Sequence, residues 1–103
     1  MYARLVLSHI KPGLLEEVNH KLACDVIPLL EKQDGFRDEI SFYDSEANES
    51  IVLSIWDNKM YADRYGREHF PRVLLQLKED LVEPPLVRGF EVSNSTLLNR
   101  RNG

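Results

Sequence analysis

The chain has 103 residues, of which 43% are hydrophobic and 29% are charged, and this predicts one compact soluble domain with no room for a second. Its 13 Lys and Arg against 17 Asp and Glu give a net charge of -4, spread along the chain without a basic stripe, so nucleic acid is not an expected partner. The apolar runs are short and the N-terminus enters a strand pattern at once, so we expect no transmembrane helix, no signal peptide and a cytoplasmic location.

The first two expected elements are a strand and a long helix. Residues 2–10 alternate loosely around the apolar centre Leu5-Val6-Leu7 and end at the turn signal Lys11-Pro12-Gly13, which predicts a strand. Over residues 14–33, apolar residues recur at spacings of three and four and predict one apolar stripe along a helix. The residues of this stripe are Leu15, Val18, Leu22, Val26 and Leu29 or Leu30.

Three residues in this region lead to further expectations. Because proline lacks an N–H and its ring clashes with the carbonyl four residues back, we expect a kink or a restart at Pro28. Gly35 is expected to close the helix as a left-handed cap. Cys24 is the only cysteine, which excludes an internal disulfide and thiolate-cluster metal sites, and we expect it to be a small packed apolar residue.

A β-hairpin is expected next. Gly35-Phe36 opens a strand in which Ile40 and Phe42 are mixed with charges, and the polar residues 44–49 make a turn. A further strand over residues 50–56 returns from that turn, and the short link makes the pair antiparallel.

The strand that returns has apolar side chains on both faces. Ile51, Leu53 and Ile55 share one face, and Val52 and Trp56 share the other. A register slip of one residue would reverse the face that Trp56 occupies. The chain supplies helices for only one side of a sheet, so we expect a second copy of the protein to cover the other side.

The C-terminal half should hold two helical pieces and a last strand. Asn58 and its neighbour Asp57 are suitable N-caps for a short helix over residues 59–65, which Gly66 ends. A second helix starts near Pro71, an acceptable first helical position. Its buried face is formed by Val73, Leu74, Leu77 and Leu81.

Pro84-Pro85 stops this second helix, and a last strand runs from Leu86 to about Leu98. Residues 99–103 are expected to be a solvated tail, so the single domain spans residues 1–98. The element order is then strand, helix, strand, strand, broken helix, strand. This predicts an α+β, ferredoxin-like fold with a four-stranded antiparallel sheet and its helices on one face. Twofold pairing through the other face predicts a homodimer.

Three short segments show a family resemblance. They are Gly35-Phe36 after the long helix, Ser54-Ile55-Trp56-Asp57 at the end of the third strand, and Phe90-Glu91-Val92 in the last strand. On these segments the chain resembles the antibiotic biosynthesis monooxygenase family of dimeric α/β barrels. The resemblance implies a homodimer with a cleft between sheet and helices in each subunit. It also implies oxidation of a small aromatic or quinol-like molecule without metal or flavin.

The resemblance leaves two other functions open. Related dimeric barrels serve as non-catalytic ligand-binding or stress-response proteins, since fold does not imply function. A haem-degrading branch uses an Asn on the first strand, a Trp on the helix after the third strand and a His further along. Here Leu7-Ser8-His9 offers no Asn, Tyr61 or Tyr65 takes the place of the Trp, and His69 comes earlier than in that branch.

The candidate site residues lie near the break between the two C-terminal helical pieces. His69 is the candidate catalytic base, because imidazole can take a phenolic proton near neutral pH. Tyr65 is its catalytic partner, and Tyr61 shares a helix face with it and suits stacking on a planar substrate. Trp56 and Phe70 are candidate substrate-binding walls, although core packing is the simpler role for both. No histidine pair has metal-ligand spacing, so no metal site and no cofactor are expected.

Overall fold

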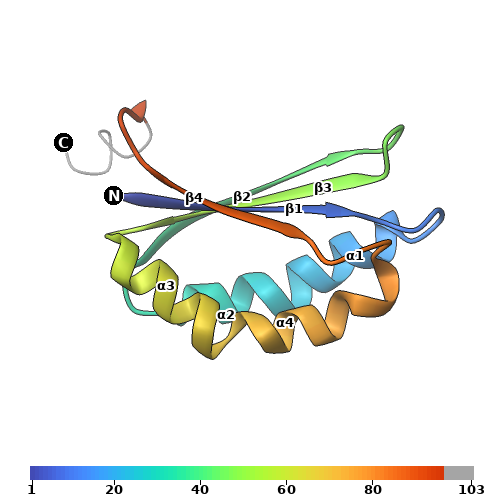
Figure 1. Cartoon of the computed structure of the whole chain (residues 1–103), viewed down its shortest axis with the longest axis horizontal. Coiled ribbons are helices and arrows are strands. Elements are labelled where there is room, and N and C mark those ends of the chain that lie inside the picture. Colours follow the sequence, from blue (N-terminus) through green and yellow to red (C-terminus); the bar gives the residue numbers. More distant parts are fainter. Residues whose placement is uncertain (97–103) are drawn as a thin grey trace.

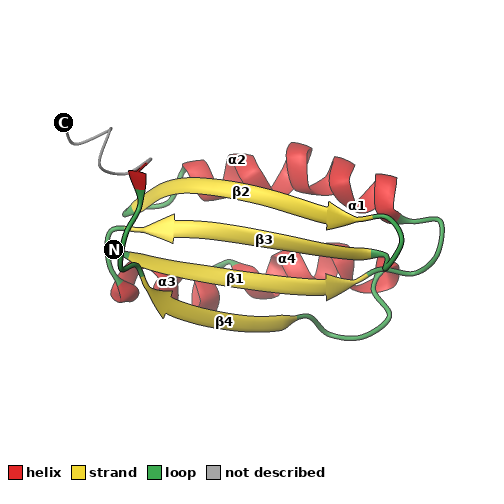
Figure 2. Ribbon diagram, turned by 90° about the horizontal axis from the view of Figure 1, so that it is seen from above, coloured by secondary structure: helices red, strands yellow, loops and turns green. Residues whose placement is uncertain are grey.

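The computed structural model describes residues 1–96 and has one four-stranded antiparallel sheet backed by helices (Figure 1). The strands are β1 (Tyr2–His9), β2 (Phe36–Asp44), β3 (Glu49–Trp56) and β4 (Leu86–Glu91). The helices are α1 (Leu15–Lys21), the π-helix η1 (Leu22–Val26), α2 (Ile27–Glu31), α3 (Lys59–Glu68), α4 (Phe70–Leu77) and the 3₁₀ helix η2 (Lys78–Asp80). The strand order is β2-β3-β1-β4 (Figure 2), which confirms the predicted α+β, ferredoxin-like fold.

The long N-terminal helix is divided by a wider turn ahead of its proline. The kink or restart predicted at Pro28 is confirmed as a restart, because α2 begins at Ile27. It follows η1, where the backbone N–H of Ile27 donates to the carbonyl of Leu22, five residues back. Pro28 then lies in the first turn of α2. A backbone N–H there has no intrahelical acceptor, so the missing N–H of proline is tolerated. The apolar stripe is confirmed, but the expected packed position of Cys24 is wrong. Cys24 lies off the stripe and is exposed.

The sheet has one face under the helices and one face free of them. Trp56 is completely buried and packs against the ring of Phe36, with 5.6 Å between ring centroids, so it occupies the helix side. A register shift between Phe36 and Asp38 marks a bulge at the start of β2. Beyond it, Ile40 pairs with Leu53 on the opposite face. The alternation predicted for β3 is confirmed.

Two predicted boundaries in the C-terminal half are wrong. Helix α3 runs through Gly66 to Glu68, because a single glycine is tolerated inside a helix. The predicted start of the second helix near Pro71 is confirmed, since helix α4 begins at Phe70 with Pro71 in its first turn. Strand β4 ends at Glu91 because its partner strand begins at Tyr2, the residue opposite Glu91. The predicted extension of β4 to Leu98 includes residues outside the described part of the chain, as does the predicted tail 99–103.

The left-handed conformation predicted for Gly35 is confirmed, with φ at +77°. A Cβ at this position would lie 2.2 Å from Cγ of Tyr61. We therefore expect Gly35→Ala to lower the free energy of unfolding by about 3 kcal/mol, since backbone strain and overpacking act together. Urea unfolding followed by circular dichroism measures the change.

Gly13→Ala is the matched control for this substitution. Gly13 also has a positive φ, +83°, but no atom lies within 4 Å of a Cβ built on it. The control variant should therefore lose only about 1 kcal/mol, the backbone part of the cost. Equal losses in the two variants would show that the contact with Tyr61 does not restrict Gly35.

Candidate functional site

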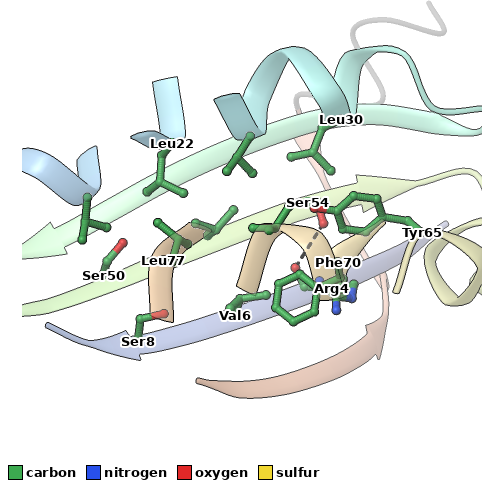
Figure 3. A pocket seen from close by; sticks show the side chains of 14 residues that line it. Arg4, Val6, Ser8, Leu22, Leu30, Ser50, Ser54, Tyr65, Phe70 and Leu77 are labelled. Atoms are coloured by element: carbon green, nitrogen blue, oxygen red, sulfur yellow. Dashed lines mark hydrogen bonds between the residues drawn. The ribbon is translucent and has the colours of Figure 1, made fainter. Parts of the chain in front are cut away.

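A small cavity lies between the helix side of the sheet and the helices (Figure 3). Its volume is about 30 Å³, enough for one or two water molecules. The apolar lining residues are Val6, Val18, Leu22, Val26, Leu30, Val52, Phe70, Val73 and Leu77, and the polar ones are Arg4, Ser8, Ser50, Ser54 and Tyr65. An aromatic ligand is larger than this volume. It can therefore bind only if the helical segment α1–α2 and the helical segment α3–α4 move apart.

Arg4 is a buried cation on β1, with only 8% of its surface exposed. Its guanidinium carbon lies 4.1 Å from the ring centroid of Phe70 and 5.3 Å from that of Tyr65. Within residues 1–96 no carboxylate forms a salt bridge with it. Burial lowers the pKa of Arg4, and the charges of Tyr65 and Asp63 partly offset that effect. Since a guanidinium stays protonated at neutral pH, the cavity has a positive charge with no carboxylate in salt-bridge contact within residues 1–96.

Tyr65 on α3 forms the wall beside Arg4. Its ring centroid lies 5.4 Å from that of Trp56 and 6.3 Å from that of Phe70. Burial raises the pKa of the Tyr65 hydroxyl, and the positive charge of Arg4 opposes the rise. At neutral pH the hydroxyl is therefore protonated and can donate a hydrogen bond to a ligand.

Ser54 fixes the sheet beneath these rings. The indole Nε1–H of Trp56 donates to Ser54 Oγ at 2.9 Å. Ser54 Oγ–H in turn donates to the carbonyl oxygen of Arg4 at 3.4 Å (Figure 3). Trp56 itself does not line the cavity and instead supports Tyr65 from behind. The serine thus holds β1 and β3 in register at the point where Arg4 enters the cavity.

A salt bridge joins the helical segment α1–α2 to the segment α3–α4 near η2. Lys21 Nζ lies 2.8 Å from Asp80 Oδ2 and also donates to the carbonyl oxygen of Gln76 at 3.0 Å. The hydrogen bond from Lys21 lowers the pKa of Asp80, and the same bond raises the pKa of Lys21. This pair connects α1 to the C-terminal end of α4, so it opposes separation of the segments α1–α2 and α3–α4.

The structure brings some of the predicted site residues together but not others. Tyr65 and Phe70 line the cavity, whereas Trp56, Tyr61 and His69 do not. His69 lies at the junction of α3 and α4 and stacks on Tyr65, with 6.3 Å between ring centroids. The catalytic roles of His69 and Tyr65 stay predictions.

The prediction from sequence missed four polar residues of the cavity, which are Arg4, Ser8, Ser50 and Ser54. The sequence does contain a signal for them, which is their position along the strands. Arg4 and Ser8 have the same parity in β1 as Val6, and Ser50 has the same parity in β3 as Trp56. Polar residues on the helix side of a sheet are candidates for a site because burial of a polar group needs a reason.

No group of three or more His, Cys, Asp or Glu side chains within residues 1–96 is arranged to hold a metal ion. No helix in the same range is both long enough and apolar enough to cross a bilayer. None of the three histidines lines the cavity. His9 instead lies on the free side of the sheet, where its ring nitrogens lie 2.9 and 3.0 Å from carboxylate oxygens of Glu49 and Glu83.

Comparison with known proteins shows a shared fold. No protein-family model matches the chain, and no curated protein matches it in sequence. A solved structure called an antibiotic biosynthesis monooxygenase superposes with a TM-score of 0.72 at 16% identity, over 91% of this chain and 100% of the other. The chain has the fold of that monooxygenase, and the resemblance predicted from sequence is confirmed at this level.

Two further solved structures are similar. A monooxygenase from Streptomyces coelicolor, in complex with nanaomycin D, has a TM-score of 0.77 at 10% identity, over 91% of this chain and 88% of the other. A protein of unknown function from Nitrosomonas europaea has a TM-score of 0.79 at 17% identity, over 92% and 91%. At these identities the similarity concerns the fold, and the function must be argued from the site.

Proposed function

We propose that this protein is a cofactor-independent monooxygenase that acts on a small aromatic or quinol-like molecule bound between the sheet and the helices. The observation that carries the proposal is the buried guanidinium of Arg4, which lies in an apolar cavity without a carboxylate partner within residues 1–96. In such surroundings a positive charge strongly stabilises an anion, because little water screens it. Arg4 therefore favours the ionised form of a bound phenol or enol.

Ionisation is the step that makes such a substrate reactive. The deprotonated ring system is electron-rich and can reduce dioxygen directly. One oxygen atom of O2 then becomes a carbonyl on a carbon that is a ring methylene before ionisation. The other oxygen atom leaves as water, with the proton that ionisation released and the remaining hydrogen of that carbon. The protein contributes the position of the substrate and the stabilisation of its negative charge. Tyr65, with its protonated hydroxyl, orients the substrate oxygen beside Arg4.

The free face of the sheet supports a homodimer (Figure 1). Within residues 1–96 no helix lies over this face, which displays many apolar side chains. They are Leu5, Leu7, Ile40, Phe42, Ile51, Leu53, Ile55, Leu86 and Phe90. Phe42 is 50% exposed and Leu86 is 55% exposed. An apolar patch of this extent is characteristic of an interface, and a second copy offers the same surface for twofold pairing.

One observation favours a non-catalytic ligand-binding dimer as the second candidate. The titratable groups of the cavity are Arg4 and Tyr65, and neither is a base at neutral pH. His69 does not line the cavity, and its ring stacks on the ring of Tyr65, which does. The haem-binding alternative has no comparable support, because no histidine is present in the cavity to ligate the iron.

Oxygen uptake with a panel of hydroquinones and hydroxylated polycyclic molecules tests the proposal. We expect uptake with at least one of them, a loss of about tenfold or more in Tyr65→Phe, and a similar loss in His69→Ala. His20→Ala is the matched control, because His20 is exposed on α1. Full activity in His69→Ala would remove that residue from the mechanism. Binding without any oxygen uptake would favour the non-catalytic alternative.

A further inference from the structure

We infer that Ser8 and Ser50 form a second polar subsite, which binds a neutral hydroxyl or carbonyl oxygen at the end of the ligand remote from Arg4. This inference rests on the proposed function, since it concerns the same cavity. It narrows the substrate to an elongated, rigid molecule with oxygen atoms at both ends.

The two serines face the cavity from neighbouring strands. Ser8 on β1 is directly opposite Ser50 on β3, and both lie on the helix side of the sheet. Ser8 is 7% exposed and Ser50 is 2% exposed. Figure 3 shows them at one end of the cavity, with Arg4 and Tyr65 at the other.

Their hydroxyl groups have no hydrogen bond in the described part of the chain. In the same part of the chain, no side-chain nitrogen or oxygen atom that lacks a hydrogen-bond partner is fully enclosed by protein atoms. The two oxygens therefore open onto the cavity. Ser54, on the same face of β3, differs because its hydroxyl bonds to both Trp56 and the backbone of Arg4.

A buried hydroxyl whose only possible partner in the free protein is a water molecule in the cavity adds little stability, and alanine would fill the same place without burial of a polar group. The rest of this end of the cavity is aliphatic, with Leu22 and Leu77 nearby (Figure 3). Packing alone thus favours no hydroxyl here. A ligand oxygen supplies the missing partner, and it can be a donor or an acceptor because serine is both.

The spacing of the two subsites sets the length of the ligand. Arg4 and Ser8 are four residues apart on one strand, which places their Cα atoms about 13 Å from each other. Val6 and its cross-strand neighbour Val52 form the apolar floor between them. Side chains reach into this span from both ends, so its length suits a planar molecule of two or three fused rings, which enters once the helices have moved apart. Its acidic oxygen lies at Arg4 and its neutral oxygen lies at the serines.

Two fluorescent probes that differ by one oxygen test this arrangement. They are 2,6-dihydroxyanthracene, with oxygens at both ends, and 2-hydroxyanthracene, with one. Fluorescence titration of the full chain should show the diol binding about tenfold more tightly than the mono-ol. In the double variant Ser8→Ala/Ser50→Ala we expect the two dissociation constants to become equal. Ser50→Thr keeps the hydroxyl and should retain the preference for the diol.

Ser41→Ala is the matched control, because Ser41 is exposed on β2 and does not line the cavity. It should keep the wild-type ratio of dissociation constants. Equal affinities of the wild type for the two probes, or an unchanged ratio in the double variant, would overturn the subsite. If neither probe binds, the subsite and the proposed function both fail. If the diol is preferred but no oxygen is consumed with any substrate, the subsite stands and only the monooxygenase proposal fails.

Discussion

Arg4→Met is expected to lower kcat for oxidation by about 10²- to 10³-fold, the cost of removing one preorganised group that stabilises an anion. The same variant should unfold at the same temperature as the wild type or at a higher one. Methionine fills a similar volume, and replacement of a buried charge by an apolar side chain is often neutral or stabilising. Activity and stability therefore change in opposite directions, which a purely structural role of Arg4 does not produce.

The pH dependence of oxidation gives a second measure of the same effect. In the wild type, we expect Arg4 to lower the pKa of a bound phenol, because an adjacent positive charge favours the ionised form. Without it, the rising limb of the kcat profile should move to higher pH. Arg4→Lys keeps the charge but loses the flat group that stacks on Phe70 and Tyr65, so its profile should lie between the other two.

Arg64→Met is the matched control. Arg64 also lies over a tyrosine ring, 5.7 Å from the centroid of Tyr61, but it does not line the cavity. It should leave kcat and the pH profile unchanged. Wild-type activity in Arg4→Met, measured on a folded protein, would contradict the role that we assign to the buried guanidinium.

The fold could be predicted because alternation and spacing follow directly from strand and helix geometry. Ile51, Leu53 and Ile55 had to share a face whatever the rest of the chain did. The stripe through Val18 and Leu22 likewise required a helix packed on a sheet. The side on which Trp56 lies needed the pairing of β3 with β1 and β2, and only the structure supplies that pairing.

The site was harder to predict because it depends on contacts between distant segments. Arg4 is flanked by Ala3 and Leu5, and nothing in that triplet tells which face the charge occupies. Burial of Arg4 arises from Tyr65 and Phe70, more than sixty residues later. The expectation for His69 rested on its place at a helix break. At that junction the imidazole stacks on Tyr65 and does not line the cavity.

Leu53→Lys is expected to convert a dimer into monomers by weakening self-association about a thousandfold. Leu53 lies near the centre of the free sheet face, opposite both Leu5 and Ile40. Removal of one buried leucine from each subunit costs about 2 kcal/mol apiece, and two opposed lysines add repulsion. Sedimentation velocity over a range of protein concentrations measures the change.

Leu75→Lys places the same substitution on a different apolar surface. Leu75 is 72% exposed on α4, on the helical side of the molecule, so this variant should sediment as the wild type does. The cavity lies on the helix side of the sheet, away from the proposed interface, so monomeric Leu53→Lys should still bind the anthracene diol if it remains folded. A wild-type protein that sediments as a folded monomer at micromolar concentration would contradict the dimer, because the apolar face would then be stable in water on its own.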